Sequence, residues 1–102
     1  MKVTILRIEG CPNWELARDR VEAAAARTGV DVDLEIRAVV SDDDAVGLGF
    51  TGSPTILVSG ANPFGGDVTG DLACRLYDTE LGSEGAPAQA QIEAALLREA
   101  NA

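Results

Sequence analysis

The stretch KVTILRIEGCPNW, residues 2–14, decides the fold we expect, because it changes from a strand pattern to a helix pattern around one cysteine. Residues 2–8 are rich in Val, Ile and Leu and end at Glu-Gly, which predicts a β-strand. Apolar residues then recur at helical spacing up to a glycine, so we predict a helix over about residues 12–28. Cys11 therefore lies between the first strand and the first helix.

The other elements follow from periodicity, caps and chain breakers. We expect strands at 31–38, 55–58 and 74–77, a short helix capped by Ser41 and a last helix over about 88–100. Glycine-rich stretches at 60–70 and 82–85 read as loops. The order strand–helix–strand–helix–strand–strand–helix predicts one α/β domain, residues 1–102, with a four-stranded mixed sheet flanked by helices.

Composition narrows the classes of partner. The chain of 102 residues carries 17 acidic and 8 basic residues, a net charge of −9, and such a field repels nucleic acid and anionic membrane surfaces. We find no targeting segment and no apolar window of membrane-spanning length, so we expect a cytoplasmic protein with no membrane partner. The sequence does not set its oligomeric state.

The chain has two cysteines, Cys11 and Cys74, which are too few for a disulfide-stabilised fold. We therefore consider them as free thiols with possible chemical roles. A helix start favours negative charge and lowers the pKa of a thiol such as Cys11. Glu9 and Glu15 lie nearby in sequence and act in the opposite direction, and Arg18 offsets them in part. The sequence leaves the sign of the net shift open.

Two segments together resemble the signatures of the thioredoxin superfamily: GCPNW at residues 10–14 and TGSPT at 51–55. The chain is most similar to small bacterial single-domain members with glutaredoxin-like proportions. The resemblance implies a thioredoxin-like fold, with Cys11 as the catalytic thiol facing a cis peptide bond before Pro54. It also implies that Ser53 and Pro54 form the substrate-binding floor of that site.

The same resemblance makes Pro12 and Trp14 lining residues, but Trp14 stands where the family has the second cysteine of C-x-x-C. Dithiol cycling within this motif is therefore excluded. Cys74 is the candidate second thiol, and the alternative is that Cys74 is a buried structural residue. If it returned from a simple hairpin it would pair near Val58, about four residues of 3.3 Å from Pro54, which is beyond disulfide reach. The long loop before Cys74 keeps another placement open.

We therefore predict a monothiol redox protein in which Cys11 exchanges with protein or small-molecule thiols and disulfides, a thiol–disulfide oxidoreductase without the second active-site cysteine. Two alternatives stay open: a non-catalytic binding module, and a carrier of soft metals such as Hg²⁺ or Cu⁺ bound by thiolates. No cofactor is expected. The chain has no histidine and no C-x-x-C pair, so we expect no closed metal site.

Overall fold

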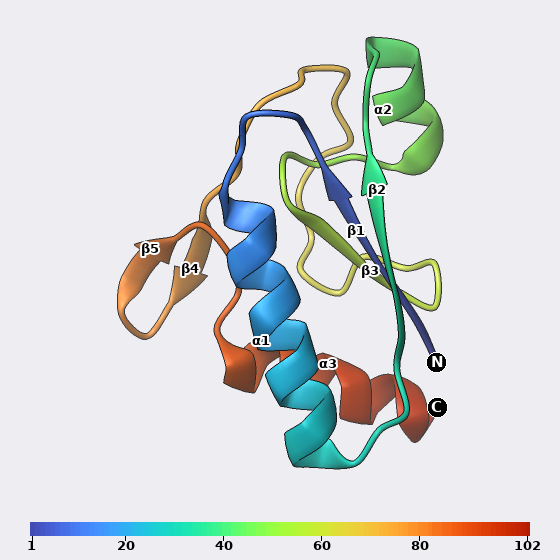
Figure 1. Cartoon of the computed structure of the whole chain (residues 1–102), viewed down its shortest axis with the longest axis vertical. Helices are drawn as coiled ribbons and strands as arrows, with labels where there is room; N and C mark the ends of the chain where they lie inside the picture. Colours follow the sequence, from blue (N-terminus) through green and yellow to red (C-terminus); the bar gives the residue numbers. More distant parts are fainter.

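A computed structural model describes the whole chain, residues 1–102 (Figure 1). The elements in order are β1 (Lys2–Arg7), α1 (Asn13–Thr28), β2 (Asp33–Ala38), α2 (Asp42–Leu48), β3 (Thr55–Val58), β4 (Tyr77–Thr79), β5 (Gly82–Glu84) and α3 (Gln89–Ala100). The three predicted helices and the first three predicted strands are confirmed within a few residues. None of the helices has the length and apolar character needed to cross a membrane.

The main sheet has three strands in the order β2-β1-β3. β1 pairs in parallel with β2, as a strand–helix–strand unit requires, and antiparallel with β3. Side chains alternate across a strand, so Val3 and Ile5 face one side of the sheet and Leu6 faces the other. This alternation in β1 divides the interior into two clusters.

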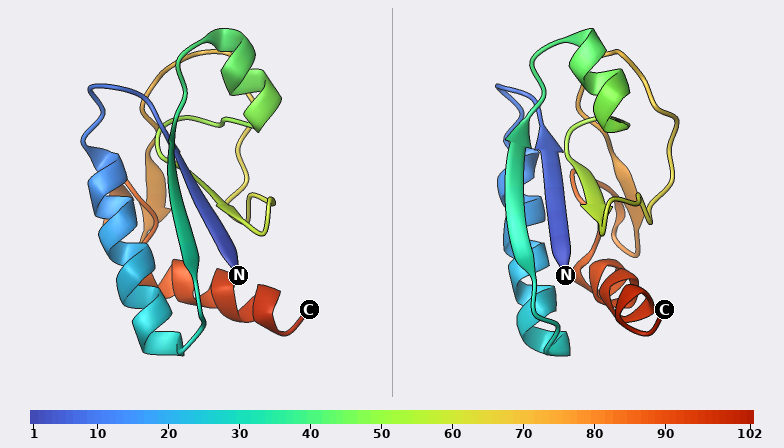
Figure 2. Two further views of the ribbon diagram at one scale, coloured as in Figure 1. Left: turned by 45° about the vertical axis from the view of Figure 1, so that its right-hand side comes forward. Right: turned by 90° about the vertical axis from the view of Figure 1, so that its right-hand side faces the viewer.

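The larger cluster lies between the sheet and helices α1 and α3. Figure 2 shows α1 running alongside β1 and β2, while α3 crosses at the end where both termini lie. Small residues on α1 let the helix approach closely, and larger residues of α3 fill the remaining space. The buried members are Val3, Ile5, Ala17, Val21, Ala24, Ile56, Val58, Ala86, Ile92 and Leu96.

The smaller cluster lies under α2 on the opposite face, near the end of β1 that leads to Cys11. Its buried members are Leu6, Val39, Ala45 and Phe50. The Ser41 hydroxyl accepts a hydrogen bond from the backbone N–H of Asp44 at 3.1 Å, which confirms Ser41 as the cap of α2. This cluster supports the sheet beneath the turn that carries the first cysteine.

The predicted four-stranded thioredoxin-like sheet is wrong. Instead of a fourth strand over residues 74–77, β4 and β5 form a separate two-stranded antiparallel sheet. The chain returning from the glycine-rich 60–70 loop meets Ser53 in the parallel sense, through a single bridge at Cys74. The next residue, Pro54, has no N–H and cannot extend that pairing into a ladder.

Candidate active site

Cys11 is placed by a tight turn between β1 and α1. The backbone N–H of Cys11 donates to the Ile8 carbonyl at 3.4 Å, and Gly10 has a φ of 83°. A positive φ at the third residue of such a turn strongly favours glycine. The turn seats Cys11 just before the first turn of α1, with only 2 % of its surface exposed.

The structure brings the two cysteines together. The Sγ atom of Cys74 lies 2.7 Å from the Sγ atom of Cys11 as two free thiols, with Cys74 donating. The pairing near Val58 that a simple hairpin would give does not occur, because the long loop returns the chain so that Cys74 lies opposite Ser53. Cys74 is exposed, so the alternative of a buried structural cysteine is wrong.

Two backbone hydrogen bonds hold the Cys74 segment. The Ser53 N–H donates to the Ala73 carbonyl at 2.8 Å, and the Arg75 N–H donates to the Ser53 carbonyl at 2.9 Å. Cys74 is thus held between two residues that are both anchored on Ser53. The backbone N–H and carbonyl of Ser53 are therefore both bonded to the chain's own segment.

The environment favours the thiolate at Cys11. Burial opposes its ionisation, but hydrogen bonding from the Cys74 thiol, the Ser53 side chain and the Asn13 backbone N–H outweighs it, so the pKa of Cys11 falls below its ordinary value. The pKa of Cys74 is raised because its thiol donates to Cys11 and because burial and the Cys11 charge disfavour a second thiolate. As a neutral thiol, Cys11 donates instead to the Ser53 carbonyl, 3.7 Å from its Sγ.

Ser53, whose carbonyl lies 3.7 Å from the Cys11 Sγ atom, and the next residue, Pro54, are both fully buried, and we call these two residues the site floor. The bond between them is cis, as the resemblance implied. The Ser53 hydroxyl accepts a hydrogen bond from the Ile8 N–H at 3.1 Å, and the Tyr77 hydroxyl donates to the Pro54 carbonyl. The floor is therefore tied both to the end of β1 and to the start of β4.

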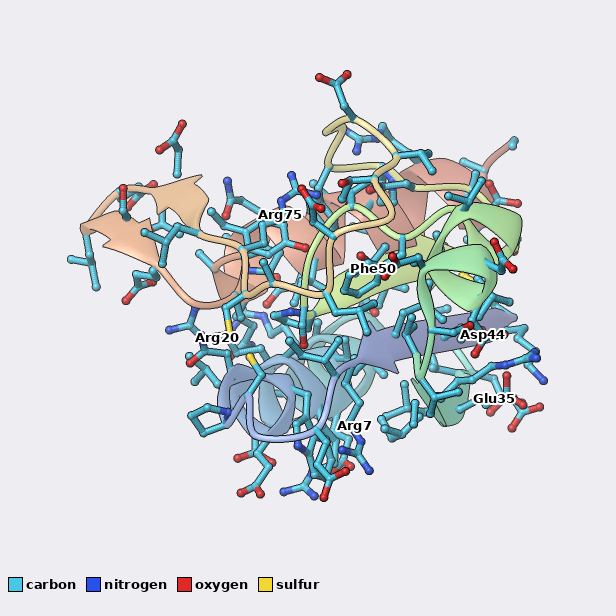
Figure 3. All side chains as sticks on the ribbon, turned by 90° about the horizontal axis from the view of Figure 1, so that it is seen from above. Arg7, Arg20, Glu35, Asp44, Phe50 and Arg75 are labelled. Atoms are coloured by element: carbon cyan, nitrogen blue, oxygen red, sulfur yellow. The ribbon has the colours of Figure 1, made fainter.

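Arg75 is a residue whose part the sequence did not reveal, although it directly follows Cys74. Arg75 is labelled in Figure 3. Its guanidinium donates to the Thr51 hydroxyl at 2.8 Å and to the carbonyls of Gly65 and Phe64 at 2.9 and 3.0 Å. It also lies 4.2 Å from the centre of the Tyr77 ring. Arg75 thus joins the 60–70 loop to Thr51, which lies two residues before Ser53 in sequence.

The remaining predicted lining residues lie on α1. Pro12 is exposed at the N-cap of the helix, and Trp14 is half-buried beside the larger core. Two guanidinium groups stack on the Trp14 ring, those of Arg7 at 5.0 Å and Arg18 at 5.3 Å. These contacts give Trp14 a packing role. Trp14 itself forms no hydrogen bond with either thiol.

No protein-family model, no curated protein and no solved structure matches this chain.

Proposed function

We propose that this protein is a thiol–disulfide redox protein whose active group is the pair Cys11 and Cys74, cycling between a dithiol and an internal disulfide. The observation that carries the proposal is the distance of 2.7 Å between the two Sγ atoms. A disulfide bond is about 2.05 Å long, so closing the pair needs a shift of only about 0.7 Å. Cys74 supplies the second thiol that Trp14 removes from the helix-start motif.

The pair exchanges with an outside disulfide in two steps. One thiolate of the pair attacks the outside disulfide, forms a mixed disulfide and releases one outside thiolate. The other thiolate then attacks the protein sulfur of that mixed disulfide and releases the second outside thiolate. The protein loses two electrons and two protons, and the outside disulfide becomes two thiols. The reverse reaction, with two outside thiols as reductant, restores the dithiol.

Three features support this function beyond proximity. The lowered pKa of Cys11 increases the fraction of its thiol that is ionised, and the thiolate is the reactive form. Exposure of Cys74 leaves the pair open to solvent on one side. The segments at 10–14 and 51–55 that resemble the thioredoxin superfamily are those that hold Cys11 and its floor.

The test is a redox titration in glutathione buffers, followed by counting of free thiols and by mass spectrometry. We expect one two-electron transition that removes both thiols and lowers the mass by two hydrogen atoms. Cys11→Ser and Cys74→Ser should each abolish this transition while circular dichroism shows an intact fold. Two free thiols across the whole range of buffers, or glutathione adducts without an internal disulfide, would exclude the function.

Soft-metal binding is the second candidate, because two adjacent thiolates are the ligands that Hg²⁺ and Cu⁺ prefer. With metal–sulfur bonds of about 2.3 Å, a linear two-thiolate site separates its sulfurs by about 4.6 Å. The pair, at 2.7 Å, would have to open by about 2 Å. The observed spacing therefore favours the disulfide. Metal titration of the wild type and of each single-cysteine variant distinguishes the two functions.

A further inference from the structure

Resting on the proposed redox function, we infer that Cys74 is the sulfur that exchanges with outside thiols and disulfides, and that Cys11 is the inner sulfur that leaves and re-forms the internal bond. The helix-start position and the resemblance both assign the outside reaction to Cys11. The structure reverses these roles.

Access to the two sulfurs differs. Cys11 is 2 % exposed and is covered by Cys74, whereas Cys74 is exposed. A nucleophile attacks a disulfide sulfur from the side opposite the sulfur that leaves. For Cys74 that side faces away from Cys11, and Cys74 is an exposed residue. For Cys11 it faces away from Cys74, and Ser53 lies within hydrogen-bond distance of that buried sulfur.

The backbone around Cys74 also closes the path to Cys11. Ser53 uses its N–H and its carbonyl to hold Ala73 and Arg75, and Arg75 is itself held through three side-chain hydrogen bonds. Uncovering Cys11 would require breaking these bonds together. An outside thiol reaches Cys74 without breaking any of them.

For reduction of the internal disulfide, the chemistry of the leaving group agrees with this assignment. An outside thiolate attacks Cys74 Sγ, a new outside–Cys74 disulfide forms, and the electron pair of the broken bond goes to Cys11 as a thiolate. A thiol with a lower pKa leaves faster, and Cys11 is the member of the pair whose pKa is lowered. A second outside thiolate then takes the outside sulfur, and Cys74 is released and protonated by water. In the reverse direction Cys74 must lose its proton before it attacks an outside disulfide, and its raised pKa slows this step while its exposure permits it.

The test begins with the oxidised wild-type protein and the small thiol mercaptoethanol. Acid stops the exchange at early times because protonated thiols are not nucleophiles, and peptide mapping by mass spectrometry then locates the adduct. We expect the adduct on Cys74 and a free thiol at Cys11. An adduct on Cys11, formed from a protein that does hold the internal disulfide, overturns this inference and leaves the redox function standing.

Two single-cysteine variants give an independent readout of access. Cys11→Ser retains the exposed sulfur, and Cys74→Ser retains the buried one. We compare their reactions with the disulfides of mercaptoethanol and of a neutral cysteine peptide, with each rate divided by the thiolate fraction measured over pH. For each variant we take the ratio of its corrected rate with the small disulfide to its corrected rate with the bulkier one. This ratio should be at least about tenfold larger for Cys74→Ser than for Cys11→Ser, because only Cys74→Ser has a buried thiol. Equal size dependence would overturn the assignment.

Discussion

The Sγ atoms of Cys11 and Cys74 lie 2.7 Å apart although 63 positions separate the two residues in sequence. One thiol stands at the start of α1, and the other is carried to it by a segment bound to Ser53. This meeting of two distant segments gives the protein a two-thiol centre without a C-x-x-C motif, and its consequences can be measured.

Formation of the internal disulfide should stabilise the folded protein by about 4 kcal/mol, because cross-linking positions so far apart restricts the unfolded chain. We expect urea unfolding of the oxidised form to show a higher midpoint than that of the reduced form. Cys74→Ser should unfold at the same midpoint under both conditions. An unchanged wild-type midpoint, with the disulfide verified by thiol counting, would contradict this prediction.

The hydrogen bond from Cys74 is the strongest favourable influence on the Cys11 thiolate. Cys74→Ala removes the donor and should raise the pKa of Cys11, whereas Cys74→Ser keeps a hydroxyl that can donate and should raise it less. Each variant contains one thiol, so the ultraviolet absorbance of the thiolate against pH gives its pKa directly. Identical pKa values in the two variants would show that this hydrogen bond does not lower the pKa.

Substitution of Gly52 should disturb the site floor. Gly52 has a φ of 114°, and a Cβ there would lie 2.6 Å from the Cβ of Arg75, so Gly52→Ala combines backbone strain with a clash. We expect a loss of about 3 kcal/mol of stability and slower formation of the internal disulfide. The matched control is Gly60→Ala, where φ is 84° and nothing lies within 4 Å of the added carbon.

Gly60→Ala should lower the free energy of unfolding by only about 1 kcal/mol, from the strain of a positive φ. It should leave the rate of disulfide formation unchanged. Urea unfolding and the rate of thiol loss in oxidised glutathione measure the two effects. Equal behaviour of the two variants would mean that the contact between Gly52 and Arg75 does not position the Cys74 segment.

Tyr77 should make the fold sensitive to alkali. Burial raises the pKa of Tyr77 to about 12, against a smaller opposing effect of Arg75. Because the folded-state pKa lies above the unfolded value of about 10, the neutral phenol contributes stability that is complete below pH 10 and is lost between about pH 10 and 12. This contribution amounts to about 2–3 kcal/mol.

Tyr77→Phe should be less stable at pH 8 by about 1–3 kcal/mol, because the buried Pro54 carbonyl loses its donor. Its stability should fall less steeply than that of the wild type as the pH rises through this alkaline window. Urea unfolding at intervals across the window checks both points. A parallel decline in the two proteins would contradict the assignment to Tyr77.

The sequence by itself determined the local elements. The Val, Ile and Leu content of residues 2–8, the Ser41 cap and the helical spacing after Cys11 act over a few residues, so local chemistry decides them. The end of the first strand at Glu9-Gly10 and the position of Cys11 before α1 follow for the same reason. These features were predicted and are confirmed.

Only the tertiary structure decided where Cys74 lies, and therefore whether the two thiols are neighbours. The 60–70 loop has no periodic pattern, so its sequence does not predict in which direction the chain runs when it returns to the main sheet. That direction is set by long-range contacts: the hydrogen bonds of Ser53, the Arg75 guanidinium and the Tyr77 hydroxyl. In a simple hairpin Cys74 would pair near Val58, far from Cys11. In the structure the chain returns parallel to the segment at Ser53, and Cys74 lies beside Cys11.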